Sequence, residues 1–396
     1  MSDTTANKQP ASSAARLLPG SNNFHVIEDP AYAPSGAGEH LYVEIEKEGL
    51  TTDAVAEALA KACGRRAMEV GYAGRKDRHA VTRQWFSVHF GDEAGLATLA
   101  ERLPSGRVTV VQVTRHANKL RLGHLAGNRF RLGLADIADR DDLARRLAAL
   151  ARDGIRNRFG PQRFGVHGAT LTIARAWGAG DVVRAVELIV DPSDTWRSGS
   201  PLPNGFRPGP EGRVLGMLRK GAVPAKALRA AGEDLRKLVA SAGQSAVFNA
   251  ILDARETAGL LHRMRPGDLG CNAKGAPFLL LPDELDATNA RSAPGVLDAF
   301  CTGPLPGTSR LKPSPEVDAE ERGWSSATGI DWSWFADGGA LESPGERRPL
   351  VVPFRAAPTV AADGEVTWVE FALPSGSYAT SVLEQVGVAI PADRRG

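Results

Sequence analysis

The chain has 396 residues, of which 42% are hydrophobic and 24% are charged, so it has the composition of a globular protein and the length of two or three domains. This excludes a disordered or fibrous chain and a single small module, and the net charge of +2 does not by itself indicate a nucleic-acid partner. The longest apolar run, APFLLLP at Ala276–Pro282, is far shorter than the roughly 18 residues of a membrane span.

The N-terminal residues 1–23 are small and polar and lack the apolar core of a secretory signal. We therefore expect a flexible tail and a cytoplasmic protein. Cys63, Cys271 and Cys301 lie far apart and form no CxxC pair. They predict buried free thiols and support neither a disulfide framework nor a zinc site.

Residues 24–156 carry the pattern of a first domain in which strands dominate. A strand at 40–49 alternates apolar with charged residues, and a helix capped by Thr51 or Thr52 follows it and ends at Gly64. Further strands are expected at 84–90, with Phe86, Val88 and Phe90 alternating, at 107–113 and at 128–134, and a helix is expected from Asp139 to Gly154. Because strands and helices mix without regular βαβ alternation, we predict an α+β fold with a mostly antiparallel mixed sheet.

Residues 157–345 are dominated by segments of helical period, followed by a stretch rich in proline and tryptophan. We interpret this part as an inserted, helix-rich domain. The first domain is expected to resume over 346–396, where Val369, Phe371 and Leu373 alternate as a strand that rejoins its sheet and YATSVLEQV starts a helix.

The segment GYAGRKDRHAVTRQWFSV at Gly71–Val88 places one carboxylate, Asp77, inside a run of cations. Taken alone, Asp77 is most simply a charged turn before a strand. Neighbouring cations favour the charged form of a carboxyl group, so Asp77 would suit a nucleophile or a base better than an acid. Gly71 and Gly74 permit a tight, left-handed turn that would hold the side chain in a cleft.

Other chemistries fit these residues less well. The Walker loop needs four residues between its glycines and a Ser or Thr after the lysine, and GYAGRKD has neither. The chain lacks the GxSxG elbow that a serine hydrolase would carry, although the Ser375–Ser377 loop could still line a site. The histidines at 79, 89, 116 and 124 form no HxxxH or HExxH set, so no metal site is predicted.

A basic stretch runs from Arg102 to Arg131, with no acidic residue between Glu101 and Asp136. Such a run is more often a solvated face than a binding site, but one-sided charge is what contact with phosphates requires. Phe130 is by default a core residue of its strand. With Asn128 beside it, it could instead stack on an unpaired base.

Four segments together resemble the tRNA pseudouridine synthase D family. They are GYAGRKDRHAVTRQWFSV, RHANKLRLGHLAGNRF at Arg115–Phe130, NRFGPQRFG at Asn157–Gly165 and LPSGSYATSV at Leu373–Val382, in the family's order and spacing. Weaker likeness in FHVIEDPAYAPSGAGEHLYVEIEKEG and SAVFNAILDAR extends the resemblance from Phe24 to Val382.

The resemblance implies a pseudouridine synthase fold interrupted by the family's insertion domain, and isomerisation of uridine to pseudouridine in transfer RNA, at position 13 of the D arm. No metal or organic cofactor is implied, no protein partner is implied, and a monomer would suffice. Asp77 falls on the catalytic aspartate, Phe130 on the aromatic residue that stacks on the flipped uracil, and Asn128 on the asparagine of the same GNxF motif. Lys76 and Arg78, on either side of Asp77, are predicted to contact the RNA substrate.

The chain departs from the family pattern at two places. Glu384 stands where an arginine commonly follows the TSV triplet, and Leu17-Leu18 and Asn23-Phe24 replace a lysine ahead of an Asp-Phe pair. Arg16 is the nearest cation that could supply that charge from a shifted position. Two other classes stay open from the residues alone: a non-catalytic RNA-binding module, and a hydrolase or phosphate-binding enzyme that uses the GYAGRKD loop.

Overall fold

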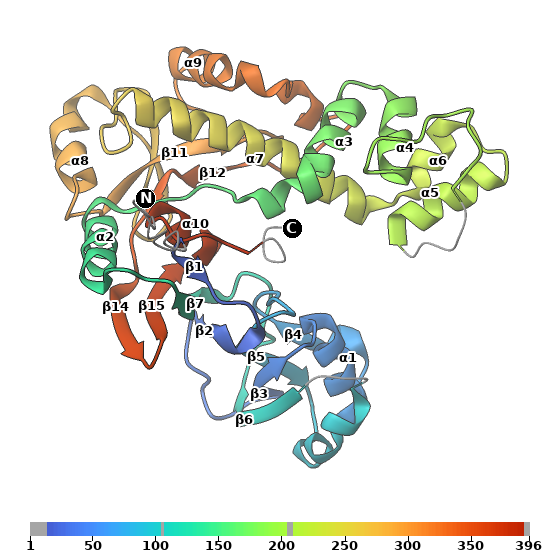
Figure 1. Ribbon diagram of the computed structural model, residues 1–396, viewed down its shortest axis with the longest axis vertical. Helices are drawn as coiled ribbons and strands as arrows, with labels where there is room; N and C mark the ends of the chain where they lie inside the picture. The colour runs from blue at the N-terminus through green and yellow to red at the C-terminus, as the bar shows by residue number, and fades with distance from the viewer. Residues whose placement is uncertain (1–13, 104–106, 204–208, 392–396) are drawn as a thin grey trace, which may run out of the picture. The chain divides into compact units, whose positions relative to one another are not determined.

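The computed structural model describes residues 14–103, 107–203 and 209–391 (Figure 1). The described chain divides into two compact units, the first comprising residues 14–151 with 353–391 and the second residues 152–352. Most of the predicted N-terminal tail, residues 1–13, lies outside the described residues. The predicted domain limits at 24–156, 157–345 and 346–396 stay predictions beside this division.

The first unit is built on one large sheet with the strand order β14-β15-β7-β2-β5-β3-β6, to which β1 adds by pairing with β7 and β4 by pairing with β5. Its strands are β1 (Arg16–Leu17), β2 (Phe24–Pro30), β3 (His40–Glu48), β4 (Val70–Tyr72), β5 (Val81–His89), β6 (Arg107–His116), β7 (Leu125–Ala135), β14 (Ala356–Asp363) and β15 (Val366–Pro374). Strands β2 and β5 run parallel, and the other described pairs of this sheet are antiparallel. The predicted α+β fold with a mostly antiparallel mixed sheet is confirmed.

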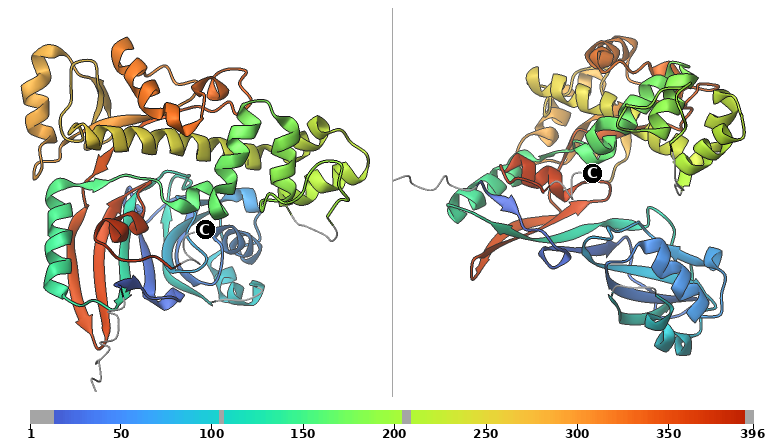
Figure 2. Two further views of the ribbon diagram at one scale, coloured as in Figure 1. Left: turned by 45° about the horizontal axis from the view of Figure 1, so that its top comes forward. Right: turned by 45° about the vertical axis from the view of Figure 1, so that its right-hand side comes forward.

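Helix α1 (Thr52–Ala62) covers the β3 and β5 part of this sheet (Figure 2). The Thr51 side chain accepts a hydrogen bond from the Ala54 N–H and caps the helix, as predicted. Leu59 and Val55 pack with the inward-facing residues of both strands, including Phe86. The extension of that alternation to Phe90 is wrong: β5 ends at His89, and Phe90 has a φ of 45° and is half exposed.

The C-terminal strand rejoins the sheet of the first unit, as the alternating residues predicted. Strand β15 pairs with β7 on one side and with β14 on the other. Helix α10 (Ala379–Gln385) follows β15. Helix α2 (Arg140–Asp153) contacts β15, because Arg140 donates to the Thr367 hydroxyl at 3.0 Å, and it contacts the end of α10, because Arg146 donates to the Val386 carbonyl.

The second unit is rich in helices, as expected. They are α3 (Ala169–Gly178), α4 (Val182–Val190), α5 (Gly209–Arg219), α6 (Pro224–Ala230), α7 (Glu233–Thr257), α8 (Leu285–Ser292) and α9 (Pro315–Ser325). Figure 1 shows α3 to α6 gathered at one end of the long helix α7, and their apolar faces share a core with Trp332 and Phe335. Among the described residues, no helix combines the length and the apolar character that crossing a membrane would require.

Short strands that sequence periodicity did not predict complete the second unit. Strands β10 (Pro277–Leu279), β9 (Leu269–Asn272), β11 (Ala299–Leu305) and β12 (Glu346–Pro349) form one sheet, and β13 (Val351–Val352) pairs with β8 (Ile155–Arg156). Five of these strands hold only two to four residues, which is too few to show an alternation. The seven residues of β11 are almost all buried, so its two faces do not differ in exposure. Arg255 pairs with Asp268 at 2.7 Å with both side chains fully buried, which ties α7 to the residue before β9.

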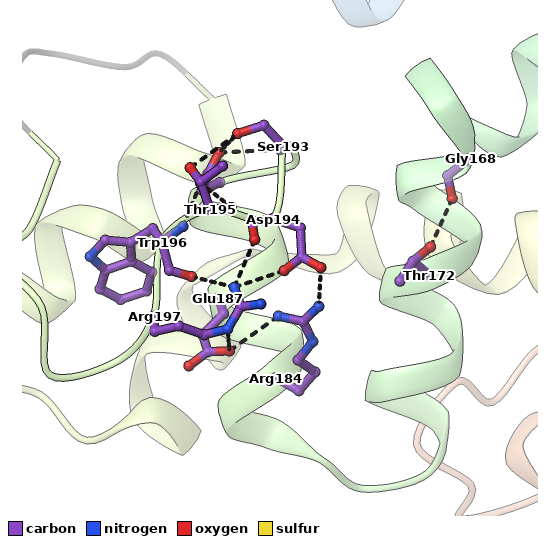
Figure 3. Close-up of polar contacts among 10 residues, drawn as sticks. Gly168, Thr172, Arg184, Glu187, Ser193, Asp194, Thr195, Trp196 and Arg197 are labelled. Carbon is purple, nitrogen blue, oxygen red and sulfur yellow. Dashed lines mark hydrogen bonds and ion pairs between the residues drawn. The ribbon is translucent and has the colours of Figure 1, made fainter.

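The segment after α4 is held by charged side chains (Figure 3). Arg184 of α4 pairs with Glu187 at 3.2 Å and with Asp194, and Arg197 pairs with Asp194 at 2.8 Å. The Glu187 carboxylate also accepts a hydrogen bond from the Ser198 N–H. These contacts give the segment a defined path without regular secondary structure.

Candidate functional site

The loop that carries Asp77, residues 73–80 between β4 and β5, is here called the Asp77 loop. Buried side chains of the sheet and of α1 hold its backbone. The Thr52 hydroxyl accepts from the Lys76 N–H at 2.9 Å and donates to Gln84 Oε1, and Gln84 Nε2 donates to the Gly74 carbonyl at 3.0 Å. Because Thr52 and Gln84 are fully buried, the loop has a fixed position on the sheet.

The Lys76 side chain turns into the protein. Its Nζ lies 2.6 Å from Glu28 Oε2, and the two side chains are only 5% and 1% exposed. Burial raises the pKa of Glu28, and the Lys76 ammonium and the Trp85 N–H oppose that rise. The ammonium of Lys76 is therefore part of the anchor of the loop.

The Asp77 side chain is exposed, and its Oδ1 accepts from the His79 N–H at 2.8 Å. This bond orients the carboxylate by closing a short turn over its own backbone. Two hydrogen bonds hold Arg78, the residue after Asp77, against Gly49. The Arg78 Nε donates to the Gly49 carbonyl at 3.0 Å, and the Gly49 N–H donates to the Arg78 carbonyl. The loop thus presents a carboxylate at a fixed place on the surface.

The other two cations of the motif have carboxylate partners of their own. Arg75 pairs with Asp53 at 3.2 Å, and Arg83 pairs with Glu44 at 2.6 Å. The charges that surround Asp77 in the sequence are thus largely used to hold the loop and the sheet.

The two glycines ahead of Asp77 do not adopt the expected left-handed conformation, so that prediction is wrong. At Gly71 a Cβ atom would lie 2.1 Å from the Leu120 carbonyl oxygen, and the position therefore requires glycine for close approach of two backbones. At Gly74 a Cβ atom would meet the Lys76 ammonium at an ordinary 3.5 Å.

A buried lysine that the motifs did not reveal lies beneath Asp77. Lys47 is 1% exposed, and its Nζ donates to the Leu50 carbonyl at 2.7 Å and to the Asp77 carbonyl at 3.0 Å. Burial lowers the pKa of Lys47 to about 8, although the charge of Asp77 opposes the shift and that of Lys76 adds to it. A cation thus sits under the loop and titrates near neutral pH.

Arg16, the residue that could supply the charge of the missing N-terminal lysine, lies away from Asn128. It faces Ala135 in the pairing of β1 with β7 and forms an ion pair with Asp136. Ala135 is at the opposite end of β7 from Asn128, roughly 20 Å along a strand that rises about 3.3 Å per residue. Lys47 is the buried cation whose ammonium contacts Asp77.

Strand register places Phe130 and Lys47 in one row across the sheet. Phe130 lies opposite Phe371 of β15 and Val26 of β2, Val26 lies opposite Thr82 of β5, and Thr82 lies opposite Lys47 of β3. Directly opposed residues project to the same face of a sheet. The Asp77 loop, held by Lys47, therefore lies over the face on which Phe130 sits.

Asn128 lies in the next row, opposite Glu28 of β2 and Leu373 of β15. Because Glu28 also binds Lys76, a single buried carboxylate connects the Asp77 loop to the strand position of Asn128. The structure thus brings Lys76, Asp77, Asn128 and Phe130 to one face, from segments that lie far apart in sequence.

Two polar atoms on this face are buried without a hydrogen-bond partner in the part of the chain that the structure describes, Asn128 Oδ1 and Thr82 Oγ1. Unpaired buried polar atoms are costly and are usually explained by a ligand or a water molecule. Phe130 is 8% exposed and contacts Phe24 and Phe371, with ring centroids 6.5 Å and 5.6 Å away. Both of its possible roles, in the core and beneath a base, are compatible with this position.

The basic stretch is divided by the fold into paired and unpaired cations. Arg107, Arg129 and Arg131 form ion pairs with Glu48, Asp29 and Glu370 of neighbouring strands. A second group lines a cavity of about 460 Å³ without any carboxylate in its wall: His116, Asn118, Lys119, Arg121 and His124, together with Tyr32. This group is here called the basic cavity, and its Lys119 and Arg121 form no ion pair with any described residue.

The histidines at 89, 116 and 124 contact neighbouring side chains. His116 stacks on Tyr32 with ring centroids 5.0 Å apart, His124 Nδ1 lies 3.0 Å from the Tyr32 hydroxyl, and His89 faces Glu39 at 3.5 Å. Within residues 14–103, 107–203 and 209–391, no three His, Cys, Asp or Glu side chains are placed to hold a metal ion. Cys63, Cys271 and Cys301 are buried free thiols, as predicted.

Burial raises the pKa of the Cys301 thiol to about 12 and that of Cys271 to about 11. Thiols with such values are poor nucleophiles near neutral pH. They do not compete with Asp77 as candidate reacting groups.

The Lys47 pKa allows a pH prediction. Lys47 is charged below about pH 8 and loses its charge as the pH rises through that value, so the attraction that holds Asp77 over the site weakens on the alkaline side. We expect any activity that needs Asp77 to fall as the pH rises through about 8. Reaction rates measured from pH 6 to 9.5 should show this alkaline limb, which is the fall in rate above about pH 8. The Lys47→Met variant should react more slowly and should lack the limb. A limb that persists in Lys47→Met would contradict the assignment.

The chain is similar to known proteins in family, in sequence and in structure. The family model described as tRNA pseudouridine synthase D matches residues 12–199 and 193–386. The tRNA pseudouridine synthase D of Geobacter metallireducens is 39% identical over 92% of this chain and 93% of its own, and that of Aeromonas salmonicida is 34% identical over 94% and 90%. A crystal structure of a Methanosarcina mazei protein assigned to the same family has a TM-score of 0.70 over 95% of both chains at 23% identity, and so shares the fold.

Proposed function

Since the chain belongs to the tRNA pseudouridine synthase D family, we propose that it isomerises uridine to pseudouridine at position 13 in the D arm of transfer RNA. The single observation that carries the proposal at the level of residues is the convergence of the Asp77 loop, Asn128 and Phe130 on one face of the sheet. The first unit is then the catalytic domain and the second the family's insertion domain.

The reaction moves the ribose from nitrogen to carbon within one nucleotide. The bond from C1′ to N1 of uracil breaks, the base turns and a bond from C1′ to C5 forms. The proton on C5 is released to solvent, and N1 takes up a proton in its place. Asp77 is the nucleophile, attacking either C1′ or C6, and its carboxylate leaves again when the product forms. Because atoms and electrons balance within the substrate, the reaction needs no cofactor.

The uracil must leave the stack of bases to reach this site. Asn128 Oδ1 has no hydrogen-bond partner among the described residues and is an acceptor for the N3–H of uracil. Thr82 Oγ1, which also lacks a partner among them, lies one row away. Phe130 lies beneath the ring as a stacking surface. These groups together recognise a pyrimidine by its polar edge and by its flat face.

Phe130→Leu tests the stacking role, because it keeps an apolar side chain in the cluster and removes the ring. We expect the rate to fall by about 5- to 150-fold, corresponding to the ~1–3 kcal/mol that a stacked base contributes. Phe371→Leu is the matched control, since Phe371 packs directly on Phe130 and is also buried. Equal losses of rate in the two variants would assign Phe130 to the core alone.

Of the cations next to Asp77, Lys76 and Arg78 hold the loop through Glu28 and Gly49, and Arg78 also remains exposed to the RNA backbone. The basic cavity supplies further phosphate contacts. We place the enzyme in the cytoplasm, where its substrate is found, and a monomer suffices because the site groups all come from one chain.

The function is tested with an unmodified transfer RNA transcript, in a buffer with a metal chelator. Pseudouridine is mapped by carbodiimide adducts that stop reverse transcription. We expect one new pseudouridine, at position 13, and none in a transcript with cytidine there. Formation at another position would overturn the assigned position, and no pseudouridine in any transfer RNA would overturn the function.

A further inference from the structure

Leu122 is an apolar side chain at the tip of a tight turn in the basic stretch. The His124 N–H donates to the Arg121 carbonyl at 3.0 Å, and Gly123 has a φ of +90°. This is the geometry of a type II turn with glycine in the third position and Leu122 in the second. Leu122 is 69% exposed.

The turn is fixed against the start of the Asp77 loop. The Gly123 N–H donates to the Ala73 carbonyl at 2.8 Å, and the Leu120 N–H donates to the Ser87 hydroxyl at 2.9 Å. Leu120 is buried, and the close approach of its carbonyl to Gly71 packs the turn directly on β4. Leu122 therefore has a defined position beside the loop that carries Asp77.

The surroundings of Leu122 are suited to phosphates. Arg121 and His124, the first and last residues of the turn, belong to the basic cavity, and Arg121 makes no ion pair with any described residue. A single exposed leucine is ordinary on a protein surface and needs no explanation. An exposed leucine next to the uncompensated Arg121 and beside the Asp77 loop is different, because nucleic-acid-binding proteins insert such side chains between bases that they unstack.

We propose that Leu122 is a wedge that enters the gap left in the base stack when the target uridine is flipped toward Asp77. This inference rests on the proposed function. The side chain takes the place of the departed base against its neighbours, while Lys119, Arg121 and the histidines of the basic cavity bind the phosphates on either side. Leu122 is a positioning residue: it touches the neighbours of the target and not the reacting atoms.

The wedge is tested by separating flipping from chemistry. In an Asp77→Asn background, which cannot turn over, a transfer RNA with 2-aminopurine next to the target reports unstacking as a rise in fluorescence. We expect the full rise in fluorescence with Asp77→Asn alone and a rise at least tenfold smaller with Asp77→Asn/Leu122→Ala. The full rise should return when the second substitution is Leu122→Met and not Leu122→Ala. With Asp77 intact, Leu122→Ala should lower the pseudouridylation rate by about 10- to 100-fold, since unstacking a base costs a few kcal/mol.

Val223→Ala is the control, because Val223 is also a strongly exposed aliphatic residue but belongs to the second unit. Its rate and fluorescence should match those of the parent protein. Equal fluorescence with and without the Leu122 side chain, while the wild-type protein makes pseudouridine, would overturn the wedge and leave the function standing. If the wild-type protein makes no pseudouridine, the function fails and the wedge with it.

Discussion

Asp77→Asn is expected to abolish pseudouridine formation while the protein stays folded and still binds transfer RNA. The substitution is isosteric, and the Asn side-chain oxygen can still accept from the His79 N–H, so the turn that orients the residue is kept. What is lost is the nucleophile, and losses of at least about a thousandfold in rate are usual when a nucleophile is removed. Single-turnover rates with saturating enzyme give the chemical step without the contribution of binding.

Asp92→Asn is the matched control for this experiment. Asp92 is exposed, belongs to the same unit, and its carboxylate likewise accepts from a backbone N–H, that of Ala94. The free energy of unfolding of both variants should lie within about 0.5 kcal/mol of that of the parent protein, as is usual for surface positions. Unchanged product in Asp77→Asn would exclude the nucleophile, and full retention of RNA binding and of every measured activity would favour a non-catalytic RNA-binding module.

The secondary structure near the site could be predicted because apolar residues alternate along its strands and point to one face. This holds for Leu41, Val43 and Ile45 in β3, although the residues between them are buried as well, and for Phe130, Leu132 and Leu134 in β7. The same pattern misled at Phe90, where the chain turns with a positive φ after the strand has ended. Local pattern cannot show where tertiary contacts end a strand.

The buried charges that support the site have a signal in the sequence outside the motifs. Lys47 continues the inward-facing series of Leu41, Val43 and Ile45, and Glu28 continues that of Phe24 and Val26. A charge at an inward-facing position is rare unless it has a partner in the fold. The partners themselves could not be predicted, because Glu28 reaches Lys76 through the parallel pairing of β2 with β5, and Lys47 reaches Asp77 through the antiparallel pairing of β3 with β5.

Charge along the sequence was a poor guide to charge in space. Many of the cations pair with carboxylates of other strands, which no local window contains: Lys76 and Arg83 beside Asp77, and Arg107 and Arg129 in the basic stretch. Lys119 and Arg121, which form no ion pair with a described residue, lie together at the basic cavity, where β6 and β7 are joined by the turn at Leu122. A search for RNA contacts should therefore begin at this cavity.

Lys76→Met should have the largest effect on stability, because it leaves the Glu28 carboxylate buried without its cation. Removing one partner of a buried ion pair typically costs about 3–5 kcal/mol. Glu28 can relieve part of this cost by taking up a proton, since burial already raises its pKa. The penalty should therefore be smaller at pH 5 than at pH 8, where Glu28 would have to stay charged. Hydrogen exchange of the backbone amides of β2 and β5, the strands next to the Glu28–Lys76 pair, measures this loss of stability.

Two further variants separate charge from packing in this anchor. In Lys76→Met/Glu28→Gln neither residue is charged, and the glutamine can still accept from the Trp85 N–H, so most of the lost stability and its pH dependence should be recovered. Arg75→Met is the control, because the Arg75–Asp53 pair is exposed and should contribute less than about 1 kcal/mol. If Lys76→Met were no more destabilising than Arg75→Met, Lys76 would not anchor the loop and its charge would be available to the RNA.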